Sequence, residues 1–384
     1  MSLPTANKNI SLLDLKAQYS QIQTEVEAAV LGVLRSGWYV LGPNVQAFEK
    51  EAAEFLNTKH AIGCANGSDA LYIALLALDI KPGDEVIVPP FTYVATAEAV
   101  TQIGATPVFA DIDLETFNMD PKDLEKKITD KTKAVILVHL FGQACQMNEI
   151  MAICKKNNIK VIEDTAQSFG TRYKDQAAGT IGDIGTYSFY PTKNMSCAGD
   201  GGMMTTNSDE LNERLRKIRA HGSNKRYYHD ELGVNSRLDE IQAAILRIKL
   251  KHINSWNERR AQLAAIYNKA LSDFENDEYK VTGPKLIEES THIYHQYSIK
   301  IESKCSKSNR ELRDELKERL KEAGIASEIY YPLSLHMQNI YKPLGYQDND
   351  LPNSVAATEQ ILCLPIYPEL EEADIQAVIT AIKL

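Results

Sequence analysis

Hydrophobic residues near the start of the chain recur at spacings of three and four, with polar residues between them. This spacing predicts a helix over residues 11–34, which Ser36 and Gly37 end, and a second helix over 45–56. Further along, short apolar runs alternate with amphipathic ones. Strands are expected over 60–65, 85–88, 107–110, 134–138 and 160–162, and helices over 70–78, 121–128, 148–156 and 209–219. Strands separated by helices of this length indicate βαβ units, and such units form a parallel sheet.

The pattern changes in the C-terminal third of the chain. Helical segments over 241–263 leave the alternating region, and from about residue 267 onward a different set of elements is expected. These are a strand over 294–301, a strongly charged helix over 308–323 and a strand over 325–330. The sequence therefore predicts an α/β protein with a large domain over residues 1–250 and a small C-terminal domain over residues 251–384.

Composition agrees with this division and narrows the possible partners. The chain has 384 residues, of which 44% are hydrophobic and 24% charged, so it can bury a full-sized core. Its net charge is −10 and it has no basic tail, which argues against nucleic acid or an anionic membrane as the main partner. An anionic substrate therefore needs a local basic pocket.

The cysteines and the N-terminus indicate a reduced, cytoplasmic protein. Six cysteines are scattered without the close spacing of a metal site, so no metal is expected and the thiols are interpreted as reduced core residues. The N-terminus lacks a basic region followed by an apolar one, and no apolar stretch reaches membrane-spanning length. We expect neither secretion nor membrane insertion.

Residues 187–202 read YSFYPTKNMSCAGDGG and hold the first candidate for chemistry, Lys193. The aromatic run before it favours a half-buried strand, which Pro191 ends, and the glycines after it allow close backbone approach. A lysine held at such a place is desolvated, which lowers its pKa, and the resulting amine can attack a carbonyl to form a Schiff base. The alternative is a lysine that only pairs with an acid such as Asp200.

Residues 161–170 read VIEDTAQSFG and hold the second candidate, Asp164. It follows a short apolar strand, at the edge where open parallel sheets bind ligands. Pyridoxal 5'-phosphate needs both groups, since its aldehyde takes a lysine and its ring nitrogen takes a carboxylate. His139 follows a neighbouring strand and is interpreted as a core residue or an indirect support, outside the catalytic set.

A third motif lies at a predicted helix start, where Asn66, Gly67, Ser68 and Asp69 follow one another. Free backbone N–H groups and the positive end of the helix dipole suit a phosphate there, although a plain helix cap is the alternative. With these motifs the chain resembles, from end to end, the DegT/StrS group of fold-type I sugar-nucleotide aminotransferases. The resemblance implies the aspartate aminotransferase fold, with a mixed, mostly parallel sheet flanked by helices and a small α+β domain.

The resemblance also implies roles for other residues around the cofactor. Tyr93 is expected to stack on the pyridine ring, with Phe91 as the fallback and core packing as the alternative. Gln167 is expected near the ring hydroxyl, and Ser188 is expected to help Gly67 and Ser68 hold the phosphate. Asn235 is expected to cross a homodimer interface to the partner's cofactor phosphate, so that the two subunits share their active sites.

Candidates for substrate contacts lie in three further segments of the chain. The basic, aromatic segment 221–229 contains Lys225 and Arg226, which are candidates for a nucleotide diphosphate, with a solvated loop as the alternative. Arg237 is a candidate for the diphosphate or a sugar carboxylate. Tyr330, Tyr331 and His336 lie in a segment that resembles the family's sugar pocket, but Tyr330 stands where a histidine is commoner, which leaves the sugar open.

The resemblance implies an aminotransferase that takes its amino group from L-glutamate. The sequences of these motifs are most similar to those of enzymes that aminate C3 of UDP-2-acetamido-2-deoxy-3-oxo-glucuronate. That reaction is a step towards bacterial surface polysaccharide such as lipopolysaccharide O-antigen. A dTDP-linked 3-keto-6-deoxyhexose is the competing substrate. A dehydratase of the same family carries histidine in place of the Schiff-base lysine, so Lys193 argues against that activity. A non-catalytic sensor could dispense with both Lys193 and Asp164, whereas this chain retains both.

Overall fold

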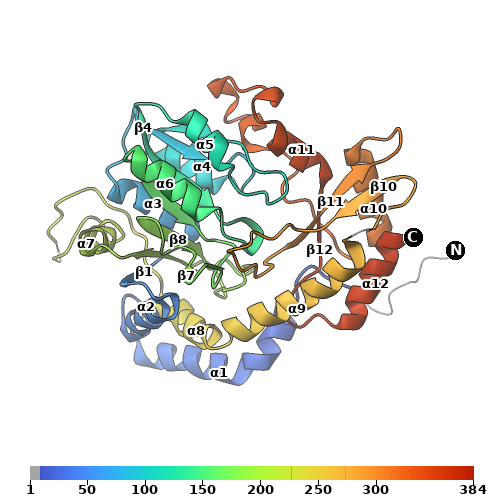
Figure 1. The fold of residues 1–384 in the computed structure, drawn as a ribbon. Coiled ribbons are helices and arrows are strands. Elements are labelled where there is room, and N and C mark those ends of the chain that lie inside the picture. Colours follow the sequence, from blue (N-terminus) through green and yellow to red (C-terminus); the bar gives the residue numbers. More distant parts are fainter. Residues whose placement is uncertain (1–8, 226, 273) are drawn as a thin grey trace.

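The large domain is built on one seven-stranded sheet (Figure 1). The structure is a computed structural model that describes residues 9–225, 227–272 and 274–384. In sheet order the strands are β1 (His60–Cys64), β9 (Gly202–Thr206), β8 (Ile184–Ser188), β5 (Lys160–Asp164), β4 (Thr132–Val138), β2 (Glu85–Val88) and β3 (Thr106–Phe109). Only β9 runs antiparallel to its neighbours, so the expected mixed, mostly parallel sheet is confirmed.

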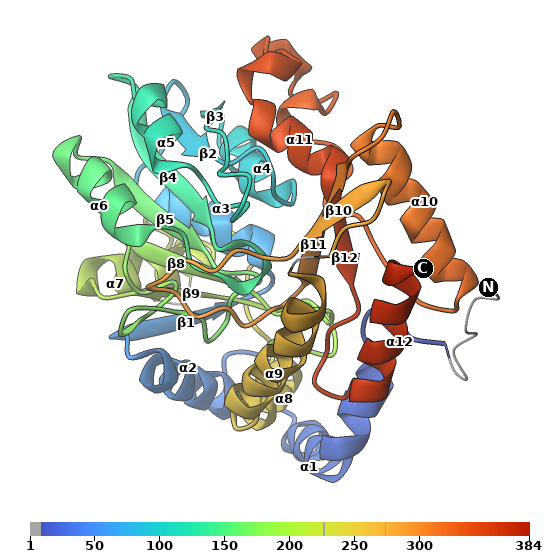
Figure 2. The same cartoon turned by 45° about the vertical axis from the view of Figure 1, so that its right-hand side comes forward.

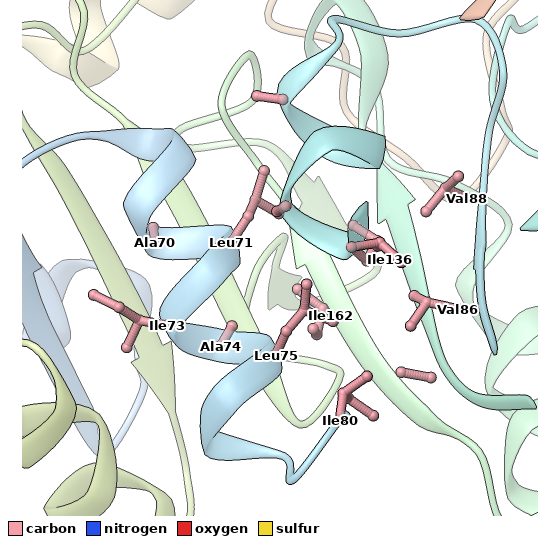
Figure 3. Close-up of a cluster of buried hydrophobic side chains, with 14 of the residues drawn as sticks. Ala70, Leu71, Ile73, Ala74, Leu75, Ile80, Val86, Val88, Ile136 and Ile162 are labelled. Atoms are coloured by element: carbon pink, nitrogen blue, oxygen red, sulfur yellow. The ribbon is translucent and has the colours of Figure 1, made fainter. Parts of the chain in front are cut away.

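Helices cover both faces of this sheet and complete a three-layer domain. One face packs against α3 (Gly67–Ala77), α4 (Ala95–Gln102) and α7 (Asp209–Ile218). The other packs against α5 (Pro121–Lys127), α6 (Met147–Lys156), α2 (Pro43–Leu56) and α8 (Glu240–Leu250). The long helix α1 (Leu15–Ser36) lies outside α8. Figure 3 shows how Leu71 and Leu75 of α3 face Ile136 and Ile162 of the central strands, which fixes α3 across the sheet.

The small domain has its own antiparallel sheet of β10 (Tyr279–Thr282), β11 (Tyr297–Ser303) and β12 (Ile361–Leu364) (Figure 2). This sheet packs with α10 (Asn309–Glu322) and α12 (Glu372–Lys383), and α11 (Pro352–Gln360) precedes β12. The helix α9 (Ile253–Leu271) starts beside the large domain, and its second half lies in the core of the small one. Because Ile10 pairs with Ile325, the start of the described chain also joins the small domain.

Several expected elements differ in the structure. The strand expected over 325–330 is wrong: the segment changes partners along its length, with isolated bridges from Ile325 to Ile10 and from Glu328 to Cys363, so no continuous ladder forms. The first helix starts at Leu15 because the Asp14 carboxylate accepts the first backbone N–H groups. Among the described residues, no helix is both long and apolar enough to cross a membrane.

Candidate active site

A cavity of about 530 Å³ opens at the carboxyl edge of the parallel strands, between the two domains. Most of its wall comes from loops that follow β1, β2, β5 and β8. The small domain adds His295 and Gln296 before β11, together with Tyr330 and Tyr331. The remaining lining residues that concern the chemistry are Asn66, Gly67, Ser68, Thr92, Tyr93, Thr96, Asp164, Gln167, Ser188, Lys193 and Asp200.

Lys193 is presented to this cavity by a loop that is fixed on both sides. Before it, β8 ends at Ser188 and the side chain of Phe189 is buried. The backbone N–H of Lys193 donates to the carbonyl of Tyr190 at 2.8 Å, and the next side chain, Asn194, donates to the carbonyl of Phe169 at 2.8 Å. The lysine therefore points into the cavity from a rigid turn.

The electrostatics of Lys193 favour an amine. Burial lowers the pKa of its ammonium group, and the nearby carboxylate of Asp164 opposes this only in part. Asp200 lines the same cavity, yet within the described chain no carboxylate oxygen lies within 4.0 Å of the Lys193 Nζ atom. The alternative of a lysine paired with Asp200 is therefore not what the structure shows.

Asp164 faces the cavity because of its position on β5. Side chains alternate along a strand, and Ile162 packs on the α3 side of the sheet, so Asp164 also points to that side. Its Oδ1 atom accepts the N–H of Ala166 at 3.1 Å, and its Oδ2 atom accepts the hydroxyl of Thr96 at 3.0 Å. Burial raises the pKa of this carboxyl group, and the two hydrogen bonds oppose the rise.

Glu163, the neighbour of Asp164 on β5, points to the opposite side of the sheet and has a structural role. Its carboxylate accepts backbone N–H groups from Gly179, Ile181 and Gly182 at 2.8, 2.7 and 2.6 Å. The Nε2 atom of His139 lies 2.9 Å from the same carboxylate. Both side chains are fully buried, so the interpretation of His139 as a core residue is confirmed.

The first turn of α3 lies against the end of β8 and forms a cradle. Asn66 caps the helix by accepting the N–H of Asp69 at 2.8 Å, which leaves the N–H groups of Gly67 and Ser68 for a ligand. A Cβ atom on Gly67 would lie 2.6 Å from the Cβ of Ser188, so only glycine permits this approach. Helix N–H groups and the serine hydroxyl together suit a phosphate.

Aromatic and amide side chains complete the wall. Tyr93 lines the cavity and is 60% exposed, so its ring is free to cover a flat ligand. Phe91, the fallback for stacking, is instead buried against Phe117 and Tyr331. The Gln167 side chain accepts the N–H of Phe141 at 2.7 Å and donates to the Tyr331 hydroxyl at 3.3 Å, which leaves one amide hydrogen for a ligand.

The structure does not bring all the expected residues together. Asn235 and Arg237 line a separate surface cavity of about 280 Å³ with Val40. Lys225 is exposed, with its Nζ atom 4.5 Å from the centre of the Tyr228 ring.

His336, another expected residue, also lies away from the cavity. His336 is 1% exposed, and its Nδ1 atom lies 2.9 Å from the Ser334 hydroxyl, so it packs outside the cavity. Arg226 lies outside the described residues.

Thr96, His295 and Gln296 line the cavity without having been predicted from sequence. For Thr96 a signal was present, because Thr92 and Thr96 are four residues apart at a helix start and therefore share one face. His295 and Gln296 gave no such signal, since their segment precedes a strand of the other domain. Only the packing of the two domains turns these side chains towards Lys193.

The three chemical features of the cavity fit one cofactor. A desolvated amine suits an aldehyde, a buried carboxylate suits a ring nitrogen, and a helix start with a serine hydroxyl suits a phosphate. These are the functional groups of pyridoxal phosphate, and the doubly covered, mostly parallel sheet with its small antiparallel domain is that of fold-type I aminotransferases. Fold and site together define a pyridoxal phosphate enzyme of fold type I.

Comparison with known proteins gives the family. The chain belongs to the DegT/DnrJ/EryC1/StrS aminotransferase family, whose model matches residues 20–383. It is therefore a sugar-nucleotide aminotransferase family enzyme, and pyridoxal phosphate is the cofactor typical of that family.

Curated relatives of similar identity carry different names. The chain is 46% identical to a pleiotropic regulatory protein of Geobacillus stearothermophilus, over 97% of this chain and 98% of the relative. It is 40% identical to the UDP-2-acetamido-2-deoxy-3-oxo-D-glucuronate aminotransferase of Pseudomonas aeruginosa, over 97% and 99%. It is 41% identical to the dTDP-3-amino-3,6-dideoxy-alpha-D-galactopyranose transaminase of Aneurinibacillus thermoaerophilus, again over 97% and 99%.

A solved structure supports the assignment of the fold. The crystal structure of S. venezuelae DesV in complex with a ketimine intermediate superimposes with a TM-score of 0.93 at 39% identity, and 98% of each chain is covered. The similarity thus extends over both domains.

Proposed function

We propose that this protein transfers the amino group of L-glutamate to the 3-keto group of UDP-2-acetamido-2-deoxy-3-oxo-glucuronate. The product is a 3-amino sugar for a bacterial surface polysaccharide such as O-antigen, made in the cytoplasm. The observation that carries the general reaction is that Lys193, free of any carboxylate within 4.0 Å among the described residues, shares one cavity with the buried Asp164. The identity of the sugar rests on the relative from Pseudomonas aeruginosa.

The residues expected around the cofactor each have a role in this proposal. When bound, the cofactor carries the amino group between the two substrates and withdraws electrons from the reacting carbon. Lys193 holds the cofactor and moves a proton to and from Cα of the donor, a task that its lowered pKa favours. Asp164 would hold the ring nitrogen, and Tyr93 would cover the ring. Gly67, Ser68 and Ser188 would hold the phosphate, and Gln167 would bind the ring hydroxyl.

The charge of the cavity supports a second subunit in the working enzyme. Among the described residues that line it, Lys193 is the only lysine or arginine, whereas a nucleotide diphosphate and glutamate are both anionic. Asn235 and Arg237 lie on a face that also carries Val40, and the adjacent Trp38 and Tyr39 are 57% and 48% exposed. We propose a homodimer in which this face meets the partner and its polar side chains complete the partner's site.

Arg237 is the residue we assign to the sugar carboxylate of the partner's substrate. A guanidinium group binds a carboxylate through two parallel hydrogen bonds, which a lysine cannot do. A 6-deoxy sugar has a methyl group at that position and would leave the guanidinium without an anion. This difference in chemistry separates the uronate from the competing dTDP-linked 6-deoxyhexose.

The proposal is tested by the second half of the reaction alone. Protein loaded with the amine form of the cofactor is mixed with a panel of 3-keto nucleotide sugars, and the return of the aldehyde form is followed by absorption. We expect the UDP-linked uronate to react fastest and Arg237→Lys to slow that substrate more than any nucleotide sugar without a carboxylate. Fast reaction with the dTDP-linked 6-deoxy sugar and none with the uronate would overturn the sugar assignment and leave the aminotransferase intact.

The relative from Geobacillus stearothermophilus gives a second candidate function, because it carries the name of a regulatory protein at 46% identity. A regulatory protein that only binds ligand does not need an amine and a ring carboxylate in one cavity, and this chain has both. Turnover of glutamate and any keto sugar in the same assay would exclude a purely ligand-binding role. Binding without turnover over the whole panel would favour it.

A further inference from the structure

A chain of two buried hydroxyl groups ends on the carboxylate of Asp164. Thr96 is 1% exposed, and its Oγ1 atom donates to Oδ2 of Asp164 at 3.0 Å. Thr92 is 3% exposed, and its Oγ1 atom lies 3.3 Å from that of Thr96. A hydroxyl has one hydrogen to give, and Thr96 gives its hydrogen to the carboxylate, so Thr92 is the donor to Thr96. Such chains polarise one another and strengthen the terminal bond to the anion.

The backbone links this chain to the part of the wall that faces a cofactor ring. Thr96 lies in the first turn of α4, and its N–H donates to the carbonyl of Tyr93 at 3.2 Å. Tyr93 is the exposed aromatic residue of the cavity. A single turn at the start of α4 therefore positions both Tyr93, which lines the cavity, and Thr96, which donates to Asp164.

We propose that Thr96 is a positioning residue that keeps Asp164 ionised and turned towards the ring nitrogen of the cofactor, an inference that rests on the function proposed above. The two carboxylate oxygens have one direct donor each among the described residues, namely Ala166 for Oδ1 and Thr96 for Oδ2. If Thr96 loses its hydroxyl, Oδ2 is left buried without a hydrogen-bond donor from the protein. The Asp164 carboxylate would then take up a proton more readily, and it would no longer hold a bound ring nitrogen in its protonated form.

Other groups near Asp164 do not replace this hydrogen bond. Lys193 and His139 favour the ionised carboxylate through charge alone, and Tyr331 faces it from the small domain. The Tyr331 hydroxyl accepts a hydrogen bond from Gln167 and, among the described residues, makes none to Asp164, and the Nε2 atom of His139 faces Glu163. The hydroxyl of Thr96 is therefore the side-chain donor whose removal tests the role.

The test compares three variants of the full-length protein. Thr96→Val keeps the shape and removes the donor, while Thr96→Ser keeps the donor. Thr358→Val is the matched control, since Thr358 is 3% exposed and its hydroxyl donates to the carbonyl of Val355 at 2.7 Å within α11, away from the cavity. Loss of a hydrogen bond to a charged group corresponds to roughly a 10- to 150-fold change in affinity. We expect Thr96→Val to weaken binding of pyridoxal phosphate by about this factor and the other two variants to remain close to the parent.

The decisive measurement repeats the titration with a deaza analogue of the cofactor, in which carbon replaces the ring nitrogen. We expect Thr96→Val to bind this analogue as tightly as the parent does, because the analogue offers no nitrogen for Asp164. Equal weakening for cofactor and analogue would show a merely structural role and overturn the inference. Equal affinity of Thr96→Val and the parent for pyridoxal phosphate would overturn it as well.

Two further outcomes keep the inference separate from the proposed function. If borohydride reduction fails to attach pyridoxal phosphate to Lys193 in the parent protein, the proposed function itself fails. If attachment succeeds and Thr96 has no effect, only the role of Thr96 fails. Should Thr96→Val not fold, Thr96→Cys takes its place, because a thiol is a weaker donor and is expected to shift affinity in the same direction by less.

Discussion

Replacing Gly67 by alanine tests how closely the phosphate cradle is packed. Gly67 is the first residue of α3, and a Cβ atom there would lie 2.6 Å from the Cβ and 3.1 Å from the Cα of Ser188. Both of these atoms belong to the backbone or are fixed by it, so rotation of a side chain cannot relieve the contact. The first turn of α3 must move away from the end of β8, which widens the site for the phosphate.

The expected size of this effect has a built-in reference within the same chain. Gly32 lies inside α1, four residues before the helix ends at Ser36, and has no atom within 4 Å of an added Cβ. Gly32→Ala should therefore stabilise the protein by about 0.5–1 kcal/mol through helix propensity. Gly67→Ala should destabilise it by about 1–3 kcal/mol, the usual cost of an overpacked site. The same chemical change is thus expected to have opposite signs at the two positions.

Thermal melting of the cofactor-free protein and titration with pyridoxal phosphate measure both consequences. We expect Gly67→Ala to melt below the parent and to bind the cofactor more weakly, and Gly32→Ala to melt at or above the parent with unchanged affinity. If Gly67→Ala melts like Gly32→Ala and binds the cofactor like the parent, then the close approach to Ser188 does not form the cradle and the placement of the phosphate is wrong.

Three further predictions follow from the site. Asp164→Asn should bind the cofactor more weakly and lose most turnover, because the neutral amide cannot stabilise a protonated ring; near-normal turnover would contradict this. Mixing Lys193→Ala subunits with Asn235→Ala subunits should restore some activity, since one hybrid site keeps both residues, and no restoration would argue against shared sites. Burial raises the pKa of Glu163, but hydrogen bonds from His139 and the backbone hold it below the ordinary value of 4.5, so its contribution to stability is present above that pH and is lost as pH falls through the native pKa. The melting-temperature gap between the parent and Glu163→Gln should therefore be largest near neutral pH and close in acid, whereas a gap that stays constant would refute the assignment.

Most local elements could be predicted from the sequence, because their signals lie within a few residues. The alternation of apolar runs predicted five strands of the large sheet close to their observed bounds, for example β2 at Glu85–Val88. Where a cap was overlooked, as at Asp14, the boundary was wrong by one turn. The chemistry of Lys193 and Asp164 was also visible, since an amine after a strand and an acid at a strand end each have a recognisable context.

Contacts that depend on which strands are neighbours could not be predicted in this way. β8 pairs with β5, and only this pairing brings the loop of Lys193 to the end of Asp164. The segment 325–330 has a composition suitable for a strand. It forms only single-residue bridges, from Ile325 to Ile10 and from Glu328 to Cys363, so no ladder forms. Likewise, the bond from Thr96 to Asp164 joins residues 68 positions apart, and the packing of two domains turns His295 towards the cavity. Periodicity and caps act over one or two turns of chain, whereas these contacts arise from the packing of distant segments, which no local pattern encodes.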